Sequence, residues 1–409
     1  APGAFLPGCT RAGPVPMASY QPNLPASQAN PYPALSRLRR EQHVYRSAEL
    51  QAWILTSYAA CDAALHDDET FSSDPAHASG GLGDSVRSIR AAVPLGSAPI
   101  LGNSDPPDHT RLRAIVNRAF TPRAMTATRP AVEAMVSRAL AGAGARPEVM
   151  AALAEPVVIA AVQEHLGIPE QDRQGFRQAA MAILRARSEG PTYNPAAEAG
   201  YRDLSWLLEE RWQSAGIPTT TVLGTLIEAA SKGERITTDE TLMLLIHIST
   251  AGNGPTACAI GNLALALAEH PEVQDLARSD PTSLPSIVEE SLRFDSPTHV
   301  VARFARRDTS LGGRTIRAGD TAYCVIGAAN RDPDRFRRPD DFQADRKDNR
   351  HLSFGMASHF CLGAPLARME LEVVLAQLLE TLHPFRLAAF ERGGTFLLRG
   401  PKAITLERA

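Results

Sequence analysis

The chain has 409 residues, of which 44% are hydrophobic and 21% are charged, and its formal net charge is −3. This composition supports a large folded core, and the small net charge gives no broad electrostatic attraction to nucleic acid. The sequence contains no apolar run long enough to cross a bilayer, and its first residues lack the pattern of a secretory signal. The five cysteines lie apart without a Cys-x-x-Cys pair, which argues against a disulfide framework and predicts a reducing, cytoplasmic setting.

The first half of the chain predicts a short β region followed by helices. Residues 1–33 are rich in proline and lack a helical period, so we expect an irregular N-terminal arm before one domain that spans 34–409. Residues 43–57 predict two short strands, residues 58–66 a helix, and residues 72–104 a long loop. Amphipathic helices follow from Pro122 to Lys232. A Gly/Pro break at 190–194 separates the helices predicted at 171–187 and 195–215, an arrangement that suits a lid.

The second half predicts one long helical segment, mixed short strands and a last helix. Thr237 and Glu240 have the spacing of a capping box and open the segment from Thr238 to His270. Beyond Pro297, short strand-like pieces alternate with turns, and residues 364–382 form an apolar periodic run. The sequence therefore predicts a mainly α fold with a minor β region near the two ends.

One cysteine lies directly before that last helix, in the segment Phe354-Gly355-Met356-Ala357-Ser358-His359-Phe360-Cys361-Leu362-Gly363. The helix dipole and the free N–H groups of the first turn favour the thiolate there, and a thiolate is a metal ligand. A zinc site would need further ligands at suitable spacing, which the sequence does not provide. Taken alone, the cysteine is equally typical of a buried core thiol.

The whole segment closely resembles the heme-binding loop of the cytochrome P-450 superfamily, whose pattern is Phe-Gly-x-Gly-x-His-x-Cys-x-Gly. Ala357 stands where the family usually has glycine. The resemblance implies the single, triangular, mainly α fold of that family and a bound heme b (iron protoporphyrin IX). It also implies that Cys361 is the axial thiolate of the heme iron, that His359 lies at a propionate, and that Phe354 and Gly363 contact the heme.

Three further basic residues match positions that bind heme propionates in this family. His109 and Arg113 are four residues apart at the start of a helix, so they share one face. Arg303 lies in the segment Val300-Val301-Ala302-Arg303. The resemblance implies that all three bind the propionates, whereas each one taken singly reads equally well as a solvated surface base.

Glu290 and Arg293 are three residues apart, a spacing at which two side chains on a helix can meet. Exposed pairs of this kind are common. The resemblance instead implies a buried structural pair, with Arg346 as a third member, that fixes the core on the heme side.

The clearest departure from the family lies in the oxygen-activating helix. The family usually has Ala-Gly-x-Asp/Glu-Thr-Thr, where this chain has Ala251-Gly252-Asn253-Gly254-Pro255-Thr256. Gly254 replaces the acid and Pro255 the first threonine, and neither carries a transferable proton. Thr256 is about 100° further around the helix, so we expect it to point away. Because Pro255 lacks an N–H and clashes with the carbonyl of Ala251, we also expect a kink.

Four residues are assigned to the substrate pocket. His247 shares a helical stripe with Ala251 and Pro255, and His299 lies four residues before Arg303. Thr250 and Phe396 complete the set. A histidine held in the core is the alternative for His247 and His299. The hypothesis for the missing acid and alcohol is that a substrate group or an ordered water, positioned by one of these histidines, takes their place.

The function implied is that of a heme-thiolate monooxygenase that oxidises a small, free or carrier-bound organic molecule in natural-product tailoring, with electrons from a ferredoxin and a ferredoxin reductase. Two alternatives remain at this stage. One is a peroxide-driven, oxidative-coupling or rearrangement enzyme, because such chemistry does not need the usual proton relay. The other is a non-catalytic heme-binding or carrier-docking protein. The sequence leaves the substrate and its regiochemistry open.

Overall fold

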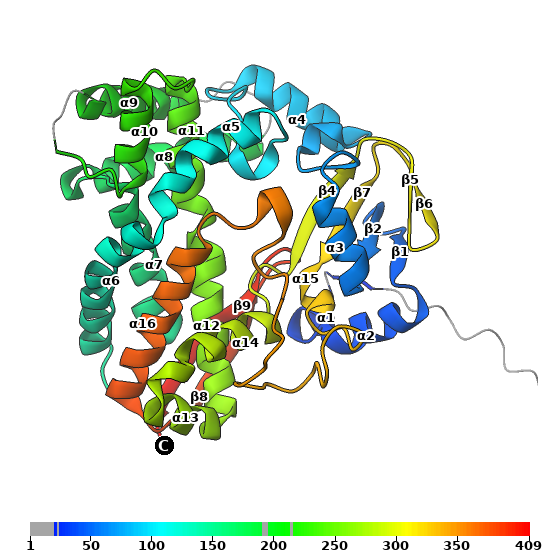
Figure 1. Cartoon of the computed structure of the whole chain (residues 1–409), viewed down its shortest axis with the longest axis vertical. Coiled ribbons are helices and arrows are strands. Elements are labelled where there is room, and N and C mark those ends of the chain that lie inside the picture. Colours follow the sequence, from blue (N-terminus) through cyan, green and yellow to red (C-terminus); the bar gives the residue numbers. More distant parts are fainter. Residues whose placement is uncertain (1–19, 23, 190–194, 213–215) are drawn as a thin grey trace, which may run out of the picture.

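A computed structural model of the chain describes residues 20–22, 24–189, 195–212 and 216–409. Figure 1 shows helices packed together on one side and a β-sheet with its flanking helices on the other. Among the described residues, no single helix has the length and apolarity needed to cross a membrane. One sharply bent pair, Met150–Leu166 with Glu170–Leu184, meets those criteria only when its two helices are taken together.

The five-stranded sheet has the order β1-β2-β7-β4-β3, and only the β2–β7 pair is parallel. The two strands and the helix predicted within 43–66 are confirmed as β1, β2 and α3. The elements of this part are α1 (Pro25–Ala29), α2 (Tyr32–Glu41), β1 (Val44–Ser47), β2 (Ala52–Leu55), α3 (Tyr58–His66), β3 (Phe71–Ser72), β4 (Val300–Ala305), β7 (Thr321–Val325) and α15 (Ile326–Ala329).

Two segments predicted to be irregular contain helix. Within the predicted arm, residues 25–29 form α1. The predicted loop at 72–104 contains η1 (Pro75–His77), α4 (Gly81–Ala92) and η2 (Leu101–Asn103). Glycine and serine disfavour a helix at α4, but tertiary contacts override this propensity. The guanidinium of Arg90 donates to both carboxylate oxygens of Asp74, and the backbone at Gly83 lies too close to the carbonyl of Ala78 for any larger residue.

The helical region expected between residues 122 and 232 is confirmed, although the predicted break at 190–194 lies outside the described residues. The remaining elements are α5 (Asp108–Val116), η3 (Asn117–Phe120), α6 (Pro122–Gly142), η4 (Met150–Ala154, a π-helix), α7 (Glu155–Leu166), η5 (Glu170–Asp172), α8 (Arg173–Glu189), α9 (Pro195–Trp212), α10 (Val222–Ser231), α11 (Thr238–Ala251), α12 (Asn253–Glu269), α13 (Pro271–Ser279), η6 (Pro281–Ser283), α14 (Leu284–Phe294), β5 (Thr309–Leu311), β6 (Arg314–Ile316), η7 (Ala357–His359), α16 (Ala364–Leu382), β8 (Phe385–Gly394) and β9 (Arg399–Arg408).

The helix predicted from 238 to 270 begins with the expected capping box and is then interrupted. The Thr237 hydroxyl accepts from the Glu240 N–H, and the Glu240 carboxylate accepts from the Thr237 N–H. The helix is divided at Gly252 into α11 and α12, three residues before Pro255. The expected interruption is therefore confirmed. It follows from the missing N–H of Pro255, since Gly252 itself keeps right-handed helical angles of φ −76° and ψ −25°.

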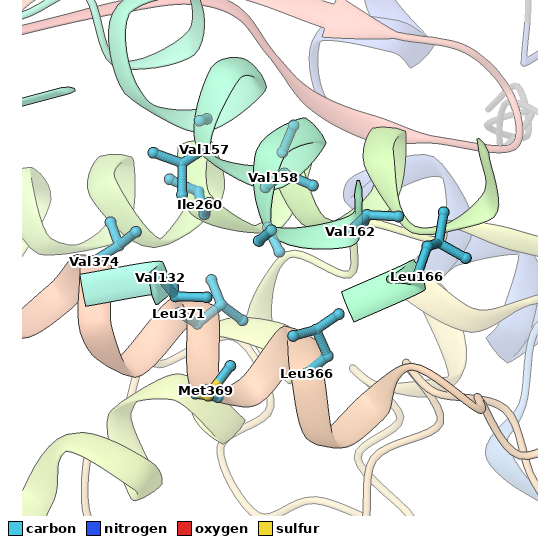
Figure 2. Close-up of a cluster of buried hydrophobic side chains, with 14 of the residues drawn as sticks. Val132, Val157, Val158, Val162, Leu166, Ile260, Leu366, Met369, Leu371 and Val374 are labelled. Atoms are coloured by element: carbon cyan, nitrogen blue, oxygen red, sulfur yellow. The ribbon is translucent and has the colours of Figure 1, made fainter. Parts of the chain in front are cut away.

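The main core lies where α7, α12 and α16 come together. Figure 2 shows Val158 and Val162 of α7, Ile260 of α12 and Leu366 and Leu371 of α16 meeting in one apolar cluster. Truncating one such buried leucine to alanine typically costs 2–5 kcal/mol. This packing holds α16, and with it the loop that carries Cys361, in a fixed position against α12.

Candidate active site

The cysteine loop folds into a tight turn before α16. The Cys361 N–H donates to the carbonyl of Phe354 over 2.7 Å, and the Gly355 N–H donates to the carbonyl of Leu352. Gly355 has a φ of +67° and Ala357 a φ of +54°. The turn therefore needs a left-handed residue at the position where Ala357 departs from the sequence pattern, and alanine adopts that conformation at a cost.

A cavity of about 320 Å³ opens between this loop and the helix pair α11–α12. Cys361 is exposed to it, together with Phe354, His359 and Gly363 of the loop. The opposite wall is formed mainly by His247, Ile248, Ala251, Gly252, Pro255, Thr256 and Ala259. A larger polar cavity of about 610 Å³, lined by residues that include Tyr32, Asp295 and Arg399, contains none of these loop residues.

The surroundings of Cys361 act on its thiol in opposite directions. Desolvation raises the pKa of Cys361 above its ordinary value, although backbone hydrogen bonds from Gly363 and Ala364 and the charge of Arg113 lower it. The loop by itself therefore does not produce the stable thiolate that the helix dipole alone suggested. A bound metal ion would remove the thiol proton outright.

Several histidine and arginine nitrogens near one edge of the cavity lack hydrogen-bond partners among the described residues. The rings of His109 and His359 stack with centroids 4.1 Å apart. Both ring nitrogens of His109, Nε2 of His359 and Nε of Arg303 are buried without a partner among the described residues. Burial lowers the pKa of His359 to about 3, and His109 and Arg303 add to this effect. Such unsatisfied donors fit an anionic group placed at this edge.

Arg113 joins α5 to the cysteine loop. Its guanidinium donates to the carbonyl of Phe360 over 2.6 Å and to the side chain of Asn117 over 2.9 Å. Arg113, Arg303 and His359 line the cavity, whereas His109 lies behind His359.

Glu290 and its partners form a buried network behind the loop. Its carboxylate accepts two hydrogen bonds of 2.8 Å from Arg293, one of 3.0 Å from Arg346 and one from the Gln343 N–H. Arg293 in turn donates to the carbonyl of Asn330. The Asn330 side chain accepts from the Leu352 N–H and donates to Ser353, so the network extends to the residues just before the cysteine loop.

Two residues of the helix pair, Gly254 and Thr256, lie as follows. Gly254 is not in the cavity wall, and a Cβ at this position would point at Leu398, 3.3 Å away. Thr256 was expected to point away and instead lines the cavity. Pro255 and Thr256 are consecutive residues of α12, and the cavity wall is wide enough to include both side chains despite the 100° step between them.

Three of the four predicted substrate residues also lie outside the cavity wall. The Thr250 hydroxyl donates to the backbone carbonyls of Ile246 and His247 in the preceding turn. His299 packs against the ring of Tyr32 and the backbone of Gly327, and Phe396 packs against the ring of Tyr323. His299 and Phe396 instead line a separate small cavity.

A bulge explains the position of His299. The N–H groups of His299 and Val300 donate to one carbonyl, that of Leu397. When two consecutive N–H groups share one acceptor, side chains no longer alternate regularly between the two faces of the strand. Thr298 and Val301 therefore line the cavity, while His299 does not. His247 lies in the wall as expected, and burial lowers its pKa to about 4.

The sequence analysis missed several wall residues, among them Leu65, Leu101, Phe120, Val162, His165 and Glu370. Their apolar members carry no local signal beyond helical periodicity. Glu370 does carry a signal, since it is an acid inside the apolar run of α16.

The comparisons with known proteins agree with this arrangement. A sequence profile described as Cytochrome P450 matches residues 206–388. The chain is 34% identical over 362 residues to the cytochrome P450 monooxygenase PikC of Streptomyces venezuelae, covering 86% of this chain and 84% of that protein. The chain belongs to the cytochrome P450 family.

Two further relatives extend this assignment. The polyketide biosynthesis cytochrome P450 PksS of Bacillus subtilis is 30% identical over 369 residues, covering 88% of this chain and 90% of that protein. The crystal structure of P450BioI in complex with an acyl carrier protein that carries hexadec-9Z-enoic acid superposes with a TM-score of 0.80 at 28% identity. This match covers 94% of this chain and 99% of that one. The mainly α cytochrome P450 fold and the expected enzyme class are thereby confirmed.

Heme is the cofactor of this family, and the site fits it. A thiol opens into a largely apolar cavity, and unpartnered histidine and arginine nitrogens line one edge of that cavity. An iron-binding sulfur and a cationic edge for carboxylates are the two features that iron protoporphyrin requires of a protein.

Proposed function

We propose that this cytochrome P450 is a monooxygenase that oxidises a small, largely apolar organic molecule in natural-product biosynthesis, with electrons from a ferredoxin and its reductase. The observation that carries the proposal is the single thiol, Cys361, facing the interrupted helix pair across a largely apolar cavity. The names of the relatives PikC and PksS support monooxygenation and a biosynthetic role.

The residues around the cavity would hold the heme in the following way. Cys361 would bind the iron as a thiolate, and Arg113, Arg303 and His359 would bind the propionates, with His109 supporting His359 from behind. The Glu290–Arg293–Arg346 network would fix the loop. When bound, the heme supplies reductive activation of dioxygen.

The character of the cavity suggests the kind of substrate. Leu65, Leu101, Phe120, Val162 and Val301 present apolar surface, whereas His247 places one neutral imidazole in the wall. Because its pKa is about 4, His247 is uncharged at neutral pH and can donate one hydrogen bond and accept one. A mainly apolar substrate with one polar group matches this wall. The acyl carrier protein complex of P450BioI supports a carrier-bound form of it.

Protons must enter the cavity without the usual acid and alcohol, because Gly254 and Pro255 stand in their places. A hydroxyl, carboxyl or amine of the substrate, or a water held by His247, would then occupy the site beside the interrupted helix. Pro255 has no N–H to donate to the carbonyl of Ala251, as a regular helix would require at this position.

The test is reconstitution of the purified chain with a ferredoxin, its reductase and NADPH under labelled dioxygen. Incorporation of one labelled atom into a product supports the proposal. Product formed only with added peroxide would favour the peroxide-driven alternative, and heme binding without turnover in either system would favour a non-catalytic heme protein.

The role of His247 has its own test. Substrate analogues without the polar group should release peroxide in place of product, and His247→Ala should weaken the binding of the native substrate. Full coupling with hydrocarbon analogues, together with unchanged behaviour of His247→Ala, would contradict this part of the proposal.

A further inference from the structure

The polar cavity of about 610 Å³ has no role in the function proposed above. Its lining and that of the cavity at Cys361 have no described residue in common. Its volume lies in the range of about 300–1,000 Å³ that is typical of small-molecule sites. The buried residues Asn262, Asp295 and Arg399 form its floor, whereas Arg40 and Glu269 are exposed at its mouth.

The charged residues that line the polar cavity are mainly arginines. Four arginines face three carboxylates there: Arg40, Arg331, Arg392 and Arg399 against Glu269, Asp295 and Asp340. Arg331 pairs with Asp340, and Arg399 pairs with Asp295. The excess of positive charge favours an anionic ligand over a cationic one.

The charge of Arg392 is incompletely compensated by the chain. Its guanidinium lies 3.2 Å from the Asp295 carboxylate, which also accepts hydrogen bonds from Arg399 and from the Tyr32 hydroxyl. The Nε atom of Arg392 is buried without a hydrogen-bond partner among the described residues. Desolvation lowers the pKa of Arg392 despite Asp295. Desolvation also acts on Arg399, but there Asp295 outweighs it and the pKa is raised. Arg392 therefore has donors to offer to a second anion.

The same cavity wall contains a hydrogen-bond acceptor. Asn262 is 3% exposed, and its side-chain nitrogen donates to the carbonyls of Asp295 and Arg399. This orientation leaves its Oδ1 atom without a partner among the described residues. Buried polar groups that lack partners call for a ligand or a water that supplies them. Arg392 and Asn262 together fit a molecule that carries an anionic group and a hydroxyl or an amine.

The floor of the polar cavity continues into the wall of the cavity at Cys361. Asp295 belongs to the floor, and Pro297 and Thr298, which follow it closely, line the cavity at Cys361. The Arg399 N–H donates to the Pro297 carbonyl over 2.8 Å, while the Arg399 side chain holds Asp295. A ligand that orders the side chains of the floor also orders the segment 295–298. A second ligand that packs on this segment then loses less conformational entropy.

We propose that the polar cavity binds a metabolite-sized organic anion whose carboxylate or phosphate pairs with Arg392, and that this anion strengthens ligand binding at Cys361 through the segment from Asp295 to Thr298. No covalent step is involved. The inference goes beyond the proposed function, because both binding events can be measured without turnover.

Calorimetric titration of the heme-loaded protein tests the site. Glycerol phosphate and hydroxybutyrate supply the two anionic groups on a hydroxylated body, and glycerol is the uncharged control. We expect saturable binding of at least one of the two anions at millimolar concentrations and none of glycerol. Arg392→Gln should weaken that binding by about tenfold or more, because a charge-assisted hydrogen bond is lost. Inorganic phosphate that bound as tightly as glycerol phosphate would overturn the assignment to an organic anion.

Arg386→Gln is the matched control. Arg386 lies on the same strand, β8, but pairs with Glu407 and is not among the described residues of the cavity wall, so its loss should leave anion binding unchanged. In Arg392→Gln, Asp295 keeps its bonds to Tyr32 and Arg399, so the fold should be retained. If this variant nevertheless does not fold, Arg40→Gln at the mouth of the cavity tests the same charge by the same titration.

Phenylimidazole, an iron ligand with an apolar body, measures the coupling through the heme absorption band. The bound anion should lower its dissociation constant by about fivefold or more, and phenylimidazole should tighten anion binding by the same factor. Failure of both anions to bind, or equal binding by Arg392→Gln, would overturn the site. Anion binding that leaves the phenylimidazole constant unchanged would overturn the coupling alone. A lack of oxygenated product in the reconstituted system would contradict the proposed function and leave these binding results unaffected.

Discussion

The Glu290 network allows the most demanding test of the site's architecture. Glu290 and Arg293 are both 0% exposed, and Arg346 is nearly buried beside them. Glu290→Ala would leave two buried guanidinium groups facing no carboxylate. Removing one partner of a buried ion pair typically costs about 3–5 kcal/mol. Because a folded protein is stable by only about 5–15 kcal/mol, the variant should lose about a fifth of its stability or more.

Denaturant unfolding with and without heme measures this loss. The exposed pair Lys232–Glu228, with an N–O distance of 2.8 Å at the C-terminal end of α10, is the control, and Glu228→Gln should change stability by less than about 1 kcal/mol. The double variant Glu290→Met with Arg293→Met removes both charges, so it should recover part of the loss. Because the network reaches Ser353 through Asn330, Glu290→Ala should also weaken the thiolate signature of the reduced carbon monoxide complex. A loss below about 1 kcal/mol, or no recovery in the double variant, would refute this reasoning.

Three further predictions follow from single residues. Ala357→Gly should stabilise the protein by about 0.5–1 kcal/mol because it releases a left-handed alanine, whereas Gly355→Ala at a φ of +67° should destabilise it; thermal unfolding of both variants checks the sign. Cys361→His should abolish the thiolate signature of the reduced carbon monoxide complex, and an unchanged spectrum would rule out Cys361 as the ligand. Although desolvation acts to raise the pKa of Glu289, two hydrogen bonds from Arg368 and the ring of His351 at 3.3 Å hold that pKa at about 2. A depressed carboxyl pKa stabilises the fold above the unfolded value and loses that effect as the pH falls, so the wild-type protein should lose stability between about pH 5 and pH 2. Glu289→Gln should flatten that dependence in acid unfolding curves.

Local sequence determined the parts of this protein that depend on neighbours along the chain. The strands at 44–47 and 52–55, the capping box at Thr237 and the interruption before Pro255 all follow from spacing and from the backbone chemistry of a few residues. The cysteine loop was recognisable for the same reason, because its glycines, histidine and cysteine form one continuous segment. These features are decided within about one turn of helix or one strand pair.

The tertiary structure decided which way the side chains face. The bulge opposite Leu397 turned His299 out of the cavity, and the width of the cavity wall along α12 includes Thr256 beside Pro255. Packing against Asp74 and Ala78 made a helix of a Gly- and Ser-rich stretch. Glu370 became a buried residue of the cavity wall only through the packing of α16. Periodicity tells which residues share a face, but the partner of that face is set by contacts between segments far apart in sequence, and those contacts fix burial, pKa and access to the site.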